Sequence, residues 1–357
     1  MPISTLIGYT HPRCYMGKLF EKMTSAEALM EAYRLSCIGS DWKESVQRYG
    51  VDLWANTWRL QKSLRDGTYK QMPYVEFDIS ERGKTRHIKA ISIADRVVQR
   101  SLCDNVLTPC TEPYLIYDNG ASQVGKGVSF TRRRLKEHLS WHFRRYGNEG
   151  YIVLTDFHNF FGSLDHEYLL SQYEKVIPDD KVLDLVRYLV SLNGNVGLGI
   201  GAQLSQNAGV FYPTRLDQYF KTVRGIKPYA AYMDDRYAIF PALDEAHQYL
   251  RDFYEQSELI KLEVNEKKTQ IRPIKKGFTF LKCRYFVTDT GKIIEQPCKD
   301  TFIRERRKLK KYKKIGLPME TIENSYRSWR GNQKKCYYRL KKMDELYKQL
   351  YGKEVKR

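Results

Sequence analysis

Apolar residues recur at helical spacing through the first 65 residues of the chain. Residues 26–36 form one such segment, and Thr24-Ser25-Ala26-Glu27 at its start has the spacing of a helix-capping box. Residues 42–64 form a second segment. Its aromatic residues, including Trp54 and Trp58, are expected to pack in the core. The pattern therefore predicts that the chain begins with helices.

Three later segments have the patterns of β-strands. Residues 75–79 alternate apolar and polar side chains, and residues 81–84 have the composition of a turn. Residues 151–155 form a short apolar run that suits a buried strand. Residues 229–240 are apolar and aromatic on both sides of one acidic pair, which predicts a hairpin with that pair at its tip.

The C-terminal segment combines helical spacing with strong positive charge. From residue 299 onward there are 20 Lys and Arg residues against 7 Asp and Glu residues, most densely between Arg304 and Lys314. A second helical stretch covers residues 320–350. Charge runs are usually solvated helix faces or disordered tails. Aromatic residues such as Tyr326 and Trp329 interleave with the charge here, so we expect an ordered helical lobe.

Composition narrows the function classes. A chain of 357 residues can bury a sizeable core, and its net charge of +19 suits a polyanionic partner. Seven cysteines without a Cys-x-x-Cys pair indicate reduced thiols, which disfavours a zinc module. The sequence shows neither an apolar run long enough to span a membrane nor a secretion signal. We therefore expect a cytoplasmic protein with no membrane partner.

Asp234 and Asp235 are the most informative residues of the chain. Two like charges inside an apolar run are costly unless something neutralises them, and a divalent cation with oxygen ligands is the usual solution. A plain Asp-Asp turn is the alternative. Asp156 follows the predicted strand at residues 151–155, so one sheet could bring all three carboxylates together. A pair of Mg²⁺ ions held in this way suits nucleotidyl transfer.

Several further motifs occur in the order found in prokaryotic reverse transcriptases. The chain resembles the group II intron and retron superfamily at Lys84-Thr85-Arg86-His87-Ile88, Asp95-Arg96-Val97-Val98-Gln99, Asp156 with Ser163-Leu164-Asp165-His166, Gly199-Ile200-Gly201-Ala202-Gln203-Leu204-Ser205-Gln206, Tyr232-Met233-Asp234-Asp235, Leu262-Glu263-Val264-Asn265-Glu266-Lys267-Lys268-Thr269 and Gly277-Phe278-Thr279-Phe280-Leu281. Each short motif recurs by chance, but several in one order form a specific signal.

The resemblance implies an α+β right-hand polymerase. It places N-terminal helices and fingers in residues 1–150, an antiparallel-sheet palm in residues 151–290 and a basic helical thumb in residues 291–357. It implies two Mg²⁺ ions, or Mn²⁺ in their place. Nothing resembles an appended zinc or endonuclease module, so we expect a polymerase without further domains.

The resemblance also implies roles for individual residues. Asp156, Asp234 and Asp235 would be catalytic, with Lys268 beside the leaving pyrophosphate. The metal positions would be Asp156, Phe157, Asp234 and Asp235. The dNTP would contact Lys84, Arg86, Phe161, Ser205 and Gln206, and the ring of Phe161 would exclude a 2′-hydroxyl. Ile200 and Gly201 would lie at the template and influence fidelity, and Gly277, Phe278 and Leu281 would form the primer grip. Nucleic-acid binding would fall to Lys126, Arg306, Arg307, Lys310 and Lys311.

Two departures in the second palm motif bear on the subgroup. Ile200-Gly201 and Ser205-Gln206 stand where many relatives have Gln-Gly and Ser-Pro. This is similar to the reverse transcriptases of diversity-generating retroelements, which copy RNA with errors at adenines. Phage-defence, abortive-infection and retron-type enzymes are the alternatives. An RNA-dependent RNA polymerase fits less well because it usually has a polar residue in place of Phe161, and a non-catalytic RNA-binding relative would not need three carboxylates.

The resemblance further implies the partners of the chain. Template RNA, an RNA/DNA duplex and dNTPs are expected for any reverse transcriptase. A small basic helical accessory protein or a structured non-coding RNA is expected in the retroelement subgroup.

Overall fold

The computed structural model describes residues 18–81, 84–331, 333 and 337–353, without the side chains of Glu81, Lys84 and Arg86. These residues divide into two compact units. The first unit comprises the described residues up to 131 together with 155–238 and 248–269, and the second comprises 132–154, 239–247 and the described residues from 270 onward. Within the described ranges, no helix is long and apolar enough to cross a membrane.

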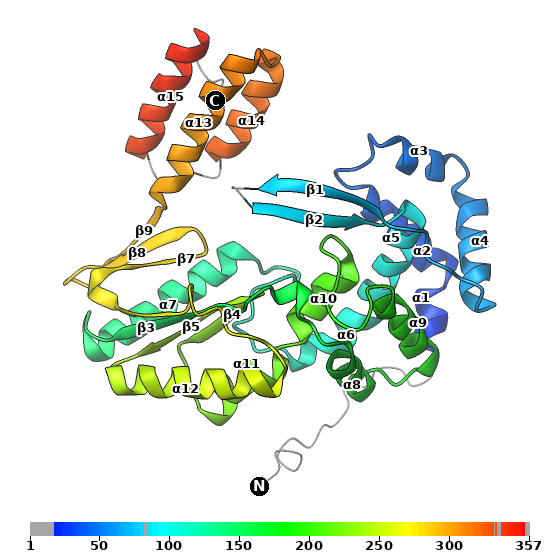
Figure 1. Ribbon diagram of the computed structural model, residues 1–357, viewed down its shortest axis with the longest axis horizontal. Helices are drawn as coiled ribbons and strands as arrows, with labels where there is room; N and C mark the ends of the chain where they lie inside the picture. Colours follow the sequence, from blue (N-terminus) through cyan, green and yellow to red (C-terminus); the bar gives the residue numbers. More distant parts are fainter. Residues whose placement is uncertain (1–17, 82–83, 332, 334–336, 354–357) are drawn as a thin grey trace. The chain divides into compact units, whose positions relative to one another are not determined.

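The first unit begins with four helices, α1 (Leu19–Met23), α2 (Ala26–Cys37), α3 (Glu44–Val51) and α4 (Leu53–Arg65) (Figure 1). The predicted helix at residues 26–36 is confirmed. Its N-cap is Ser25, whose hydroxyl accepts a hydrogen bond from the Ala28 amide at 3.1 Å. The predicted helical segment 42–64 is confirmed in type but is divided at Asp52 into α3 and α4.

The prediction that the aromatic residues of α4 pack in the core is wrong. Trp54 and Trp58 are 74% and 60% exposed, whereas Thr57, Leu60 and Leu64 are buried. Residues three and four positions apart share a helix face. The buried face of α4 therefore runs through Thr57, Leu60 and Leu64, and both tryptophans lie off that face, toward solvent.

A hairpin and a longer helical segment follow. β1 (Val75–Glu81) pairs antiparallel with β2 (Lys84–Ala90), as the sequence predicted. α5 (Ile93–Leu102) begins after Ser92, whose hydroxyl accepts a hydrogen bond from the Asp95 amide at 3.2 Å. The chain continues through η2 (Cys103–Leu107), α6 (Thr108–Thr111) and η3 (Glu112–Tyr114).

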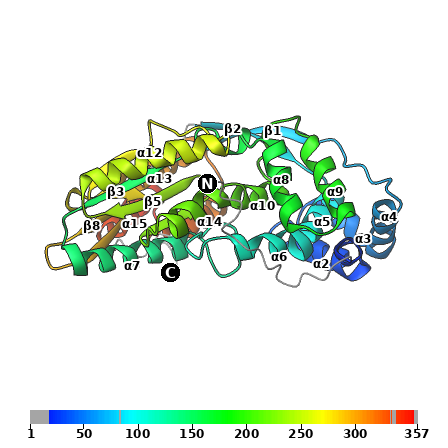
Figure 2. The same ribbon diagram turned by 90° about the horizontal axis from the view of Figure 1, so that it is seen from below.

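The chain between residues 128 and 191 contains one strand and three longer helices. α7 (Val128–Tyr146) precedes β3 (Tyr151–Thr155), which is the strand predicted at residues 151–155. η4 (Phe160–Gly162), α8 (His166–Val176) and α9 (Asp180–Ser191) follow. Figures 1 and 2 both show α8 lying beside α9.

The next segment ends in the predicted hairpin. α10 (Gln203–Phe211), α11 (Thr214–Gln218) and η5 (Tyr219–Val223) lead to β4 (Tyr229–Tyr232) and β5 (Asp235–Phe240), and α12 (Leu243–Leu259) follows. The hairpin register pairs Tyr232 with Asp235 and Ala231 with Arg236. Met233 and Asp234 are therefore the two residues of the turn.

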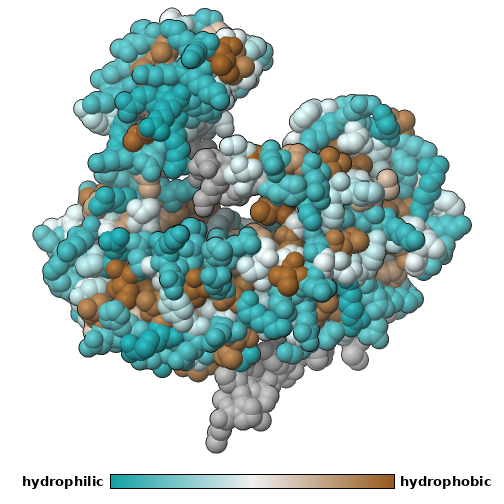
Figure 3. Space-filling model, viewed as in Figure 1, coloured by the Kyte–Doolittle hydropathy of each residue, from teal (hydrophilic) through white to brown (hydrophobic). Residues whose placement is uncertain are grey.

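The second unit contains antiparallel strands and a helical lobe. β3 pairs with β6 (Gln270–Pro273), η6 (Ile274–Lys276) follows, and β7 (Phe278–Phe280), β8 (Cys283–Val287) and β9 (Ile293–Pro297) form a three-stranded sheet in that order. The predicted ordered lobe is present as α13 (Lys299–Ile315), α14 (Met319–Gly331) and α15 (Tyr337–Tyr351). The helical stretch expected at residues 320–350 is thus two helices. Phe302, Leu309, Tyr326 and Tyr347 form part of the core of the lobe, and Figure 3 shows a mostly hydrophilic outer surface.

Candidate active site

Asp156 lies directly after β3 in a buried position of the first unit. Its side chain is 4% exposed, and its Oδ2 accepts a hydrogen bond from Lys268 Nζ at 2.6 Å. Its Oδ1 accepts one from Asn265 Nδ2 at 2.9 Å, and the Asn265 amide donates to the Asp156 carbonyl. The sequence assigned no role to Asn265. Its place three residues before Lys268 in the same motif is the signal that could have revealed it.

The acidic pair lies at the β4–β5 turn, as the sequence predicted. Asp234 is the second turn residue, and Asp235 is the first residue of β5. Met233 has a φ of 53°, in the left-handed region. A residue with a side chain pays about 1 kcal/mol there, so contacts from the surrounding structure must hold this turn.

The carboxylates near the turn repel one another. Burial, followed by the charge of Asp156, raises the pKa of Asp234. Burial, followed by the charges of Asp234 and Asp156, raises the pKa of Asp235 to about 7. Lys268 and Arg236 oppose both shifts without cancelling them. The site therefore has less positive charge than its three carboxylates need.

Lys268 supplies part of that missing charge. Partial burial lowers its pKa, but the hydrogen bond to Asp156 and the charges of all three carboxylates raise the pKa overall. The Lys268 ammonium thus stays protonated at neutral pH. Its side chain is 49% exposed, so it is bound to Asp156 and accessible from solvent at the same time.

The donor set fits a hard divalent cation by its chemistry. Within the described ranges, no three His, Cys, Asp or Glu side chains already form a group that could hold a metal ion. Mg²⁺ is usually bound by only one or two carboxylates together with water and substrate phosphates, which suits this sparse arrangement. The Phe157 ring is buried and stacks on Phe160 and Phe253, so only the backbone carbonyl of Phe157 offers an oxygen.

Phe161 lies on α10, the helix of the second palm motif. A Cβ built on Gly209 would lie 2.9 Å from the Phe161 ring. The missing side chain of Gly209 therefore makes room for this aromatic ring. Phe161 also contacts Phe160 edge to face, with ring centroids 5.3 Å apart.

The loop before α10 lies against strand β2. Ile200 is 37% exposed, and Gly201 has a φ of 115°, where a Cβ would lie 3.8 Å from Ile88. The Ser205 hydroxyl is buried and donates to the Gly199 carbonyl at 2.7 Å, so it stabilises this loop. Gln206 is exposed on α10.

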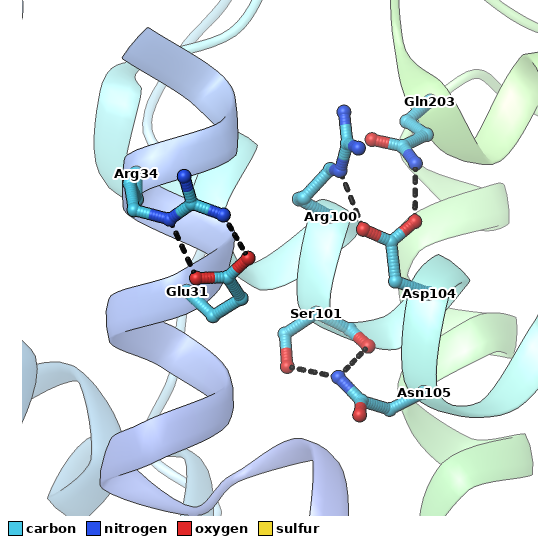
Figure 4. Close-up of polar contacts among 7 residues, drawn as sticks. All are labelled: Glu31, Arg34, Arg100, Ser101, Asp104, Asn105 and Gln203. Atoms are coloured by element: carbon cyan, nitrogen blue, oxygen red, sulfur yellow. Dashed lines mark hydrogen bonds and ion pairs between the residues drawn. The ribbon is translucent and has the colours of Figure 1, made fainter.

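The start of α10 is tied to η2. Figure 4 shows Gln203 and Arg100 both bonded to Asp104. Gln203 Nε2 donates at 3.0 Å and Arg100 Nε at 2.5 Å. This contact fixes the helix that follows the Ile200-Gly201 loop.

The basic residues expected beside the nucleotide and template have different surroundings. The backbones of Lys84 and Arg86 lie in β2 opposite Glu81 and Ile79, and their side chains lie outside the described residues. The Lys126 ammonium donates to the carbonyls of Tyr117 and Asn119 and to the Gln123 side chain. Burial lowers the pKa of Lys126. Lys126 thus closes its own loop, and its contact with nucleic acid stays a prediction.

The expected primer grip and basic helix belong to the second unit. Gly277 has a φ of 70°, and a Cβ there would lie 2.6 Å from the Phe286 ring. Phe278 is buried and stacks on Tyr285, and Leu281 lies in the turn after β7 with a φ of 42°. On α13 the four basic residues of the prediction are exposed; they are Arg306, Arg307, Lys310 and Lys311.

Comparisons with known proteins bear on the fold and the family. The model of the reverse transcriptase (RNA-dependent DNA polymerase) family matches residues 70–284, more than half of the chain. No curated protein sequence matches the chain significantly. Among solved structures, the chain is similar to a telomerase from Candida albicans in complex with the TWJ fragment of telomeric RNA, with a TM-score of 0.50 and 12% identity. The similarity covers 81% of this chain and 56% of the telomerase chain.

At this identity the structural likeness concerns the fold alone. Together with the family match, it confirms the predicted α+β right-hand polymerase fold. The chain belongs to the reverse transcriptase family, the family of RNA-dependent DNA polymerases.

Proposed function

We propose that this protein copies an RNA template into DNA by metal-dependent nucleotidyl transfer. The observation that carries the proposal is the gathering of Asp156, Asp234, Asp235 and Lys268 in one unit of a reverse transcriptase fold. The raised pKa values of Asp234 and Asp235 support a site that is completed by positive charge from outside the protein.

Asp156, Asp234 and Asp235 would hold the Mg²⁺ ions, with the Phe157 carbonyl as a further oxygen. When bound, two such ions would activate the primer 3′-hydroxyl and stabilise the leaving pyrophosphate. Lys268 keeps Asp156 charged through its 2.6 Å hydrogen bond. Its accessible ammonium would also neutralise or protonate the pyrophosphate. Phe161, held on Gly209, would pack against the sugar and exclude a 2′-hydroxyl.

The other assigned residues complete the proposed substrate path. Lys84, Arg86 and Gln206 would contact the dNTP, and the internally bonded Ser205 would support the loop beside it. Gly277, Phe278 and Leu281 would form the primer grip. The exposed basic face of α13 would bind the RNA/DNA duplex through its phosphates, which carry affinity and little sequence information. The three-part division into fingers, palm and thumb at residues 150 and 290 belongs to this proposal.

For the biological role, we propose a diversity-generating retroelement that is error-prone at adenines. Support comes from Ile200, a partly exposed aliphatic side chain beside the left-handed Gly201. An aliphatic group cannot hydrogen-bond to a nascent base pair. A small basic helical protein or a structured RNA would then be the accessory partner. A phage-defence or retron-type role is the alternative, in which Ile200 only packs under the template.

The polymerase proposal is tested by Asp234→Asn, which removes one charge at nearly constant size. We expect Mg²⁺-dependent primer extension on an RNA template by the wild type and essentially none by the variant. Asp252→Asn is the matched control, since Asp252 is a buried carboxylate of the same unit outside this site. Near-normal extension by Asp234→Asn would refute the assignment of the metal site.

The role is tested by copying a defined RNA with the wild type and with Ile200→Gln. Discrimination between partners depends on polar groups that the wrong partner leaves unpaired. We therefore expect frequent errors opposite template adenine in the wild type and fewer in the variant. Faithful copying of adenine by the wild type would exclude the retroelement role and favour a defence or retron-type enzyme.

A further inference from the structure

Arg236 is a buried cation directly after the acidic pair. Its side chain is 0% exposed. A buried guanidinium is costly unless it is paired and hydrogen-bonded. Asp217 on α11 supplies the countercharge: its Oδ1 lies 2.8 Å from Arg236 Nε, and its Oδ2 lies 3.5 Å from Nη2. The Tyr229 hydroxyl donates to the same Oδ1 at 2.5 Å.

Arg236 also contacts both segments that carry the proposed metal ligands. Its Nη1 donates to the Met233 carbonyl at 2.9 Å, inside the turn that presents Asp234. Its guanidinium carbon lies 4.8 Å from the centroid of the Phe157 ring, and Phe157 follows Asp156. One side chain therefore joins the turn, the Asp156 segment and α11.

The hairpin geometry explains how this side chain fits. Successive strand residues face opposite sides, so Asp235 and Arg236 project from opposite faces of β5. Ala231 is paired with Arg236 across the hairpin, and its small side chain leaves room for the guanidinium. The left-handed conformation of Met233 needs outside support, and the hydrogen bond from Arg236 to its carbonyl provides it.

We propose that Arg236 is a positioning residue, which Asp217 anchors and which holds the β4–β5 turn against the Asp156 segment so that the three carboxylates converge. The inference rests on the proposed metal-dependent polymerase function. It assigns Arg236 and Asp217 to the active site although neither projects toward the substrate.

The first test is Arg236→Lys, which keeps the charge but cannot reach Asp217, Met233 and Phe157 together. We expect the protein to fold, and kcat for primer extension to fall about 10- to 100-fold with little change in the KM for dNTP. Mn²⁺ binding, followed by electron paramagnetic resonance without turnover, should weaken about tenfold. Asp252→Asn, which disrupts the Arg224–Asp252 pair of the same unit, should leave both quantities within about twofold of the wild-type values.

The second test separates positioning from plain stability. In Arg236→Met/Asp217→Leu, apolar side chains replace the buried pair, which is often neutral for stability. We expect this double variant to fold while Mn²⁺ affinity and kcat stay low. Wild-type Mn²⁺ affinity and kcat in either the double variant or Arg236→Lys would overturn the inference. A wild type that binds Mn²⁺ but extends no primer would instead refute the proposed function, and the Mn²⁺ titrations would still test the role of Arg236.

Discussion

Asp235 carries its negative charge at the expense of stability. Its pKa is about 7 in the folded protein, against 3.8 for an ordinary aspartate. The folded state therefore binds more protons than the unfolded state between these two values. The protein loses stability as pH rises through this window, by ~4 kcal/mol at most. Mg²⁺ bound at the carboxylates would offset the loss, which links metal binding to proton release.

Asp235→Asn should stabilise the metal-free protein at pH 8 and do so much less at pH 4, because the amide removes a charge that is present only at the higher pH. Urea unfolding at both pH values measures the difference. Asp41→Asn, at an exposed carboxylate, is the control and should show no such trend. A gain that does not change with pH would show that Asp235 is not strained by its charge.

Phe161→Ala should admit ribonucleotides. The substitution removes the ring that lies on Gly209 and opens space where the sugar would bind. The ratio of ribonucleotide to deoxynucleotide incorporation should rise about tenfold or more. Phe286→Ala, at an aromatic ring outside the first unit, is the control. An unchanged ratio in Phe161→Ala would assign sugar selection to another residue.

At the scale of elements, helix pairs are joined by single polar side chains. In the lobe of α13, α14 and α15, Asp344 accepts two hydrogen bonds from Arg330, at 2.9 Å and 2.8 Å, and a third from Tyr326 at 2.8 Å. These bonds join α14 to α15 in the part of the lobe that also contains Tyr347. They are the reason that two separate helices form one ordered body.

Asp344→Ala should therefore loosen α15 and destabilise the lobe by about 1–3 kcal/mol, because it leaves the Arg330 and Tyr326 donors without their acceptor. Hydrogen exchange of the α14 and α15 amides is the measurement. Glu345→Ala removes a neighbouring acid of α15 for which the structure shows no such network and serves as the control. Equal protection in both variants would contradict the role given to Asp344.

At the scale of the whole molecule, charge is unevenly distributed. The net charge is +19, and residues 299–357 contribute 20 basic against 7 acidic residues. On α13 the apolar residues Phe302 and Leu309 are buried, while Arg306, Arg307, Lys310 and Lys311 are exposed. The positive charge is thus presented on an ordered surface, where it can contact phosphates at fixed spacing.

Replacing Arg306, Arg307, Lys310 and Lys311 by Gln should weaken binding of an RNA/DNA duplex for any sequence. Each lost phosphate contact releases fewer counterions, so the slope of log K against log salt should become shallower by about 0.9 per contact. Filter binding between about 50 and 200 mM salt measures both effects. Gln at Arg48, Arg59, Lys62 and Arg65, four exposed basic residues of α3 and α4, is the matched control. Identical slopes in the two variants would indicate that α13 is only a solvated surface.

Local patterns in the sequence determined much of this protein. The hairpin around Asp234 and Asp235, the buried strand before Asp156 and the helices at both ends depend on neighbouring residues, since alternation, helical spacing and capping act over a few positions. The motif order was sufficient to indicate the family. Boundaries were less certain, as the division at Asp52 and the separation of α14 from α15 show.

Other features were decided by the tertiary structure alone. Helical spacing groups Trp54 and Trp58 with their apolar neighbours, but only packing shows that both face solvent. Arg236 and Asp217 are 19 residues apart, and Asn265 and Asp156 are 109 apart. Nothing in either local segment reports the other. Such contacts, and the repulsion that raises the pKa of Asp235, arise only when folding brings distant charges into one partly desolvated site.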